Sequence, residues 1–159
     1  MTPSVSTKEV IEQWFSVFNT GDVALFDHIH DRVCRNHAPA PFDVSAWPAD
    51  GKAFGPTEAG QAVGWLRSNQ PDLHVTVEQL VAEDDQVVAW ICATGTPRGD
   101  GPIAATGRPV DVRQAHRFRV RDGKVIEHWA VRDDLRSMVQ AGVIAPPPRN
   151  HPTTGGADS

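Results

Sequence analysis

The stretch from Val110 to Val131, which reads VDVRQAHRFRVRDGKVIEHWAV, decides the fold class of this chain. Two runs rich in β-branched and aromatic residues flank Asp122-Gly123, a dipeptide that strongly favours a two-residue hairpin turn. Along the first run, charged residues occupy one parity and mainly apolar or aromatic residues the other. This period of two is typical of strands, and it predicts a hairpin with strands at 110–120 and 125–131.

The rest of the chain predicts the layer that covers this hairpin. Strand patterns recur at 73–80 and 86–96, separated by the acidic turn Glu83-Asp84-Asp85. Earlier segments predict helices at 7–18, 22–29 and 56–67 and a short strand at 31–37. After the hairpin, a final helix is predicted at 133–140. The order predicts an α+β fold, a cone-shaped barrel in which three N-terminal helices pack on a curved, mostly antiparallel sheet and enclose a pocket.

Length and composition fit one domain with a tail. The chain has 159 residues, enough for a single core that needs no disulfide or metal. Residues 1–144 are predicted to form the domain, with 38–55 as an ordered loop or lid. The end of the chain, 145–159, is rich in Pro, Gly and polar residues and is predicted to be disordered.

Charge and cysteine content argue against several classes of protein. The net charge is -5 and the sequence pI is about 5.7, which is unfavourable for nucleic-acid binding. Cys34 and Cys92 stand alone and are expected to be reduced thiols. Neither a signal-peptide core nor a long apolar run is present, so we expect a cytoplasmic protein that does not bind membranes.

Strand alternation identifies the candidate site. The charged parity should face water, which turns Gln114, His116 and Phe118 inward on the first strand of the hairpin. His128 has the inward parity on the second strand, and its position relative to the turn predicts that it lies nearly opposite His116. Two neighbouring imidazoles in an apolar cleft suggest acid–base chemistry. The competing interpretation is one histidine in the core and one at the edge of the sheet.

Further polar and aromatic residues complete the candidate site. Asn36 and His37 end the first short strand, beside the predicted lid. Asp133 either orients a histidine, acts as a base, or caps the last helix. His30 and His74 are expected at the surface or an edge. The aromatic residues that we expect to line the pocket, although each also suits the core, are Trp14, Phe15, Trp65 and Trp90. The spacing of His and Cys gives little support to a metal site, and phosphate-loop, dinucleotide and hydrolase-elbow motifs are absent.

The sequence also resembles a known family. The stretch from Thr106 to Val110, His116 to Trp129, Asp133, and Gln140 to Val143 resembles the SnoaL-like polyketide cyclase family of the nuclear transport factor 2-like superfamily. More loosely, Trp14-Phe15 with 19–22 resembles the first helix and its turn, and Asn36-His37 the first strand. The resemblance covers about positions 8 to 144, and its last 40 residues or so are the specific part.

This resemblance implies a cone-shaped barrel with a deep pocket, often assembled as a homodimer or homotetramer. Its best-known members close a ring of an aromatic polyketide by aldol condensation without metal or organic cofactor, and related ones serve as hydroxylases, epoxide hydrolases or isomerases. His116 matches a pocket histidine of the cyclases, and Asp133 matches a carboxylate of many relatives. The acid–base aspartate that follows His-Trp in the cyclases is replaced by Ala130, so their mechanism does not carry over intact.

Three hypotheses follow. The first is a cofactor-independent cyclase or isomerase of a small apolar or aromatic metabolite, with His116 as base, His128 or Asn36 as enolate donor and Asp133 as an orienting group. The second is a hydroxylase or epoxide-opening relative that depends on Asp133. The third is a ligand-binding or scaffold protein without catalysis, which Ala130 favours. Trp129 and Val131 on the outer parity suggest a dimer formed through the sheet.

Overall fold

The computed structural model describes residues 6–38 and 52–149. The helices of this part are α1 (Thr7–Thr20), α2 (Phe26–Ile29), α3 (Pro56–Asn69) and α4 (Asp134–Gln140), and the 3-10 helix η1 (Val23–Leu25) precedes α2. The strands are β1 (His30–Asn36), β2 (Lys52–Ala53), β3 (His74–Glu83), β4 (Gln86–Gly95), β5 (Val110–Arg121) and β6 (Lys124–Arg132). The predicted α+β class and order of elements are confirmed.

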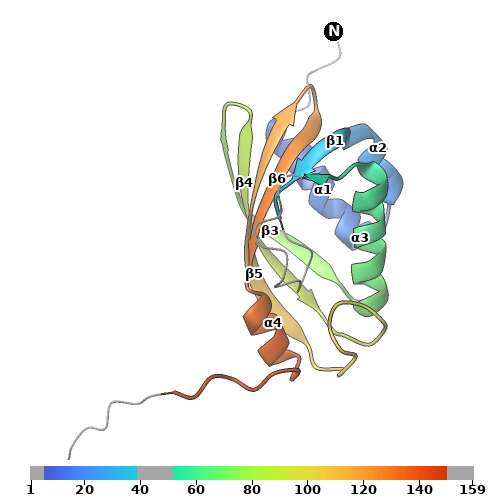
Figure 1. Ribbon diagram of the computed structural model, residues 1–159. Coiled ribbons are helices and arrows are strands. Elements are labelled where there is room, and N and C mark those ends of the chain that lie inside the picture. The colour runs from blue at the N-terminus through green and yellow to red at the C-terminus, as the bar shows by residue number, and fades with distance from the viewer. Residues whose placement is uncertain (1–5, 39–51, 150–159) are drawn as a thin grey trace, which may run out of the picture.

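The strands form one curved sheet that does not close. Their order is β2-β1-β6-β5-β4-β3, with β1 parallel to β6 and every other pair antiparallel. Helices α1, α2 and α3 lie on one side of the sheet, and α4 lies at one end of it (Figure 1). We call the side toward these three helices the inner face and the opposite side the outer face.

Local sequence signals explain where the helices begin and end. Ser6 caps α1: its hydroxyl accepts from the Glu9 backbone, and the Glu9 carboxylate accepts from the Ser6 backbone. Gly21 ends α1 with φ 75, a left-handed conformation that glycine adopts without steric strain. Pro56 occupies the first turn of α3, where its missing N–H costs nothing.

The β5–β6 hairpin forms as predicted, but its register differs. Asp122 and Gly123 turn the chain with φ 50 and 73, as a type I′ turn requires. An irregularity in the pairing between Arg119 and Val120 then shifts the partners, so that His116 lies opposite Ala130. His128 consequently lies opposite Phe118 and not His116. The pattern of alternating residues does not reveal a bulge, because one extra residue leaves the pattern intact on each side of it.

The same irregularity changes the face of the first residues of β6. Val125, which has the outward parity by simple alternation, pairs with Val120 and is fully buried. From Glu127 onward the expected parity holds, with His128 buried against the inner face. The predicted inward set of His116, Phe118 and His128 is therefore correct although the register is not.

Two further predictions fall partly outside the described residues. The segment 38–55, predicted as a loop or lid, contains β2, which pairs with Arg35 and Asn36 of β1 and was not predicted. Positions 39–51 lie outside the described residues. At the other end, 145–149 are exposed and carry no helix or strand, and 150–159 are not described. The boundary of the tail at 145 stays a prediction.

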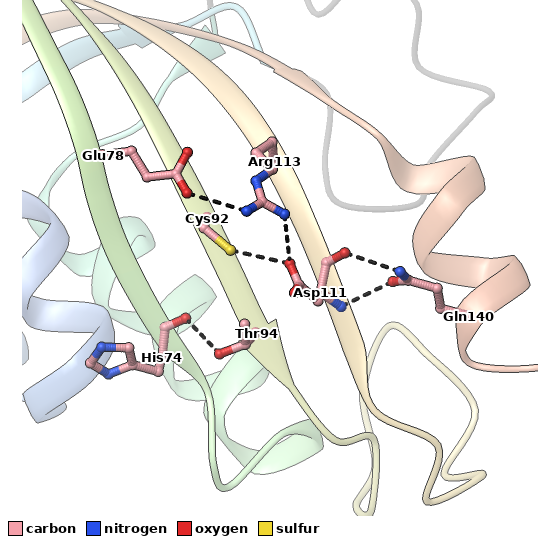
Figure 2. Close-up of polar contacts among 7 residues, drawn as sticks. All are labelled: His74, Glu78, Cys92, Thr94, Asp111, Arg113 and Gln140. Atoms are coloured by element: carbon pink, nitrogen blue, oxygen red, sulfur yellow. Dashed lines mark hydrogen bonds and ion pairs between the residues drawn. The ribbon is translucent and has the colours of Figure 1, made fainter.

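The main core lies between α1 and the inner face of the sheet. It includes Val10, Trp14 and Phe15 of α1 and Phe118 and Val120 of β5. On the outer face, polar side chains of β3, β4, β5 and α4 form a network, in which the Gln140 side chain binds both the backbone N–H and C=O of Asp111 (Figure 2). No helix of the described residues is long and apolar enough to cross a membrane.

Candidate functional site

Four side chains form a continuous chain of polar contacts on the inner face. His116 Nδ1 lies 2.9 Å from His128 Nε2. At one end, His116 Nε2 lies 3.0 Å from the Gln114 side-chain oxygen. At the other end, His128 Nδ1 lies 3.0 Å from Asn36 Oδ1. Three strands supply these residues: β5 carries Gln114 and His116, β6 carries His128, and β1 carries Asn36 as the strand partner of His128.

Three aromatic side chains surround the histidine pair. The ring of Trp14 lies 5.3 Å from that of His128, and the ring of Phe15 lies 5.2 Å from that of His116. Phe118 stacks on His128 with ring centroids 4.8 Å apart. Trp14 and Phe15 are adjacent on α1, so one turn of this helix covers the pair. The two histidines are 7% and 8% exposed.

This enclosure keeps both histidines neutral. Burial and, to a smaller extent, the positive charge of Arg132 lower the pKa of His116 to about 3. The pKa of His128 lies well below its ordinary value, first because of burial and then because of His116 and Arg132. A neutral imidazole pair has lone pairs for accepting protons, which an imidazolium pair lacks.

Arg132 is a site residue that the sequence analysis missed. It lies opposite Gln114 in the strand pairing, so it shares the inward parity of Ala130 and His128. Its side chain is only 11% exposed, and its Nε lies 3.4 Å from the Asp134 carboxylate. The parity that selected His128 also selects Arg132, but the predicted strand ended at 131, one residue before it.

Trp14 carries a buried hydrogen-bond donor close to the histidine pair. Its indole N–H has no hydrogen-bond partner among the residues that the structure describes, although the side chain is only 5% exposed. Leaving such a group unpaired costs about 1–3 kcal/mol, so native proteins rarely do so without a reason. The indole belongs to the aromatic wall around the two histidines.

Asp133 and His37 lie away from the histidine pair. The exposed Asp133 carboxylate accepts from the Arg136 backbone and caps α4, which is one of the alternatives that the sequence left open. His37 stacks on Trp129 with ring centroids 4.6 Å apart, and its Nε2 lies 3.4 Å from Glu127. Since Asn36 is turned inward, its neighbour on the strand is turned outward.

The outer aromatic residues and one histidine also depart from expectation. Trp65 on α3 and Trp90 on β4 are 45% and 47% exposed, so the structure does not bring them to the histidine pair. Val87, Ala89 and Ile91 take the buried parity of β4, which leaves Trp90 on the outer face. His30, expected at the surface or an edge, is 1% exposed beside Phe26, and burial lowers its pKa.

The described residues offer no cluster for a metal ion. No group of three or more His, Cys, Asp or Glu side chains suited to a metal occurs among them. Cys34 is fully buried, and burial raises the pKa of its thiol to about 12. The Cys92 thiol donates to Asp111 on the outer face, where burial and that carboxylate raise its pKa (Figure 2).

Solved structures with the same fold come from several bacteria. IdmH of Streptomyces antibioticus, assigned as a polyketide cyclase, is 24% identical, with 87% of this chain and 99% of IdmH covered and a TM-score of 0.74. A SnoaL-like protein of Jannaschia sp. CCS1 is 24% identical over 92% and 98%, with a TM-score of 0.72. AclR of Streptomyces galilaeus, assigned as a hydroxylase, is 21% identical over 90% and 85%, with a TM-score of 0.71.

At these identities the likeness establishes the fold, and the sequence family rests on a separate match. No curated protein matches the chain. The family model of the SnoaL-like polyketide cyclases matches residues 8–141, a span that contains the whole Gln114–His116–His128–Asn36 chain and the helix above it. This protein therefore belongs to the SnoaL-like polyketide cyclase family.

Proposed function

We propose that the protein is a cofactor-independent cyclase or isomerase that abstracts a proton from an activated carbon of a small, largely apolar or aromatic, polyketide-like metabolite. The observation that carries this proposal is the neutral, side-chain-bonded histidine pair inside an aromatic wall. His116 is the base, because a substrate has to displace only the Gln114 side chain to reach its Nε2, whereas the Asn36 oxygen beside His128 is also held by the Ala38 backbone N–H.

The low pKa of His116 suits a base that acts only when substrate is bound. In the empty site, burial and Arg132 disfavour the imidazolium. An enolate that forms beside the ring supplies a negative charge in a site of low dielectric, and this charge stabilises the imidazolium as it forms. The interaction is therefore strongest in the transition state, which is the condition for catalysis.

The enolate oxygen needs a hydrogen-bond donor, and we assign this role to residues other than His128 and Asn36, which the sequence suggested. His128 and Asn36 are engaged with each other, so neither is our choice. The unpartnered indole N–H of Trp14 is the better donor, and the Arg132 guanidinium adds positive charge on the same face. A well-placed donor of this kind contributes roughly 10²- to 10³-fold to the rate.

Proton abstraction can be tested without the natural substrate. We expect the wild-type protein to accelerate exchange of the acidic methylene hydrogens of an aromatic 1,3-diketone into D₂O, measured by proton NMR. His116→Ala should abolish the acceleration, and Trp14→Phe should reduce it roughly 10²-fold while ring packing is kept. Wild-type exchange no faster than buffer, or unchanged exchange by His116→Ala, would contradict the proposal.

The second candidate is a binding protein of the same fold. Ala130, which replaces the aspartate expected from the family resemblance, supports this candidate. Tight binding of the 1,3-diketone, measured by calorimetry, without any exchange would favour it. The hydroxylase or epoxide-opening alternative loses its main support, because the Asp133 carboxylate is exposed and caps α4.

We also propose that the protein forms a homodimer through the outer face of its sheet. Val88, Trp90 and Val131 project there from two strands and are 44%, 47% and 73% exposed. Exposed apolar side chains that lie together mark an interaction surface more often than scattered ones do.

A further inference from the structure

The direction of hydrogen bonding through the histidine pair can be worked out from one fixed end. Asn36 Oδ1 lies 3.1 Å from the backbone N–H of Ala38 as well as 3.0 Å from His128 Nδ1. The backbone N–H can only donate, so the atom that faces it must be the amide oxygen. This contact fixes the orientation of the Asn36 amide, and the oxygen requires a proton on His128 Nδ1.

The remaining protons follow from the number available. Two neutral imidazoles carry two protons on four ring nitrogens. Since His128 Nδ1 holds its proton, His128 Nε2 has a lone pair and accepts the second proton, which belongs to His116 Nδ1 at 2.9 Å. His116 Nε2 is then left with a lone pair. The Gln114 amide must present its NH₂ group to His116 Nε2. This requires the Gln114 side-chain amide to be rotated so that its nitrogen takes the place of Oε1.

The opposite assignment fails at the Asn36 end. A proton on His116 Nε2 donating to Gln114 would require His128 Nε2 to donate to His116 Nδ1. His128 Nδ1 would then direct a lone pair at the Asn36 oxygen only 3.0 Å away, which is repulsive. A third proton would remove the conflict, but it would place an imidazolium in this buried aromatic wall beside Arg132.

We infer that His128 is a positioning residue: anchored by Asn36, it holds His116 in the Nδ1–H tautomer and leaves His116 Nε2 as the nitrogen whose lone pair becomes free when a substrate displaces the Gln114 amide. The role of Nε2 as catalytic base rests on the proposed function. In that reaction the C–H electron pair becomes the enolate, and the proton forms a bond to His116 Nε2. After ring closure or isomerisation the same nitrogen returns the proton to the product, and both histidines are neutral again.

The tautomers can be read directly from ¹⁵N-histidine NMR of the unliganded protein at neutral pH. We expect protonated Nδ1 and unprotonated Nε2 for both His116 and His128. Asn36→Asp keeps the acceptor and should keep both tautomers, whereas Asn36→Ala removes it and should move the His128 proton at least partly to Nε2. In the wild type, an Nε2–H signal from either histidine, or an imidazolium at either histidine, would overturn the inference. An Asn36→Ala spectrum identical to that of the wild type would overturn it as well.

Kinetics separate positioning from simple structural support. On the 1,3-diketone probe, His128→Phe should lower kcat by roughly 10²- to 10⁴-fold with KM nearly unchanged, because the aromatic ring is kept while the tautomer is released. Asn36→Asp should retain far more of kcat than Asn36→Ala does. Predicted tautomers in a wild type that does not exchange the probe would reject the proposed function alone. An active wild type with the other tautomer would reject this inference alone.

Discussion

Ala130 is the residue at which this chain departs most clearly from the expected chemistry of its family. It lies directly opposite His116 in the strand pairing, at a distance where side chains of paired residues touch. An aspartate here would place a carboxylate beside His116. Alanine cannot exchange a proton, so the chemistry that we propose depends on the two histidines.

Replacing Ala130 tests this electrostatic account. In Ala130→Asp the new carboxylate favours the imidazolium, so the pKa of His116 should rise above its value of about 3. NMR titration of the His116 ring measures the change. Ala130→Asn is the matched control, since it has nearly the same shape and no charge, and it should leave the pKa low. Equal titration of both variants would show that position 130 does not act on His116 through charge.

The depressed pKa values also predict how stability depends on pH. Below the ordinary value of 6.5 the unfolded chain binds protons at these histidines while the folded chain does not, down to about 3 for His116. The folded protein is therefore not destabilised by these histidines above pH 6.5. As the pH falls from 6.5 toward 3, the free energy of unfolding decreases by up to about 1.4 kcal/mol per pH unit for each histidine. Urea unfolding of wild type and His116→Gln at pH 7 and pH 5 should show a smaller loss for the variant. Equal losses would contradict the prediction.

The alternation of residues along each strand determined which side chains could be assigned to a face of the sheet from the sequence. Alternation placed His116, Phe118 and His128 on the inner face correctly. It misplaced Val125, because the irregular pairing beyond Arg119 is a property of two strands together. It also gave no means of choosing among tryptophans, since Trp14 and Trp90 differ in burial only through the neighbours that the fold supplies.

At the scale of elements, two side-chain amides complete backbone pairing where a strand is missing. β3 is an edge of the sheet, and Asn19 of α1 donates to the Val75 C=O at 2.8 Å and accepts from its N–H at 2.7 Å. β6 ends before it reaches Asp111, and Gln140 of α4 makes the same pair of bonds there. Each amide also fixes a helix to the sheet.

The Asn19 contact should contribute measurably to stability. Asn19→Ala removes two hydrogen bonds and leaves the Val75 groups to find other partners, which should cost roughly 1–3 kcal/mol in the free energy of unfolding. Asn19→Asp keeps only the acceptor and should fall between wild type and Asn19→Ala. Urea unfolding at pH 7 provides the comparison, with Gln79→Ala, an exposed residue of β3, as the control. If both alanine variants unfold alike, the amide adds nothing.

Elements with strong local signals could be predicted from the sequence. Elements and pairings that depend on a strand far away in the sequence could not. The Asp122-Gly123 turn is a local signal that was visible in the sequence, and the Ser6 capping box and the left-handed Gly21 are likewise set by residues close together in the chain. β2 has only two residues and exists because β1 offers its edge, so no local pattern marks it. The parallel pairing of β1 with β6 joins segments about 90 residues apart, which alternation cannot specify.

For the molecule as a whole, the two faces of the sheet differ in what they present. The inner face, which α1, α2 and α3 cover (Figure 1), carries the histidine pair. The outer face has a polar region, in which Arg113 contacts both Glu78 and Asp111 (Figure 2), and a region that is largely apolar. That second region contains the Arg117–Trp129 contact, with the guanidinium 3.9 Å from the ring centroid, and the exposed residues Val88, Trp90 and Val131.

Assembly through this apolar region can be tested by mass. Opposed copies would bury Trp90 and Val131, so we expect a homodimer in light scattering and sedimentation at micromolar concentration. Val131→Glu and Trp90→Glu should each shift the equilibrium to monomer, because burying an unpaired carboxylate costs several kcal/mol. Val23→Glu, on η1 and 41% exposed, is the matched control and should leave the dimer intact. A wild-type monomer, or a dimer unaffected by either outer-face variant, would contradict this assembly. A tetramer that the two variants reduce to dimers would mean that a second interface exists elsewhere on the chain.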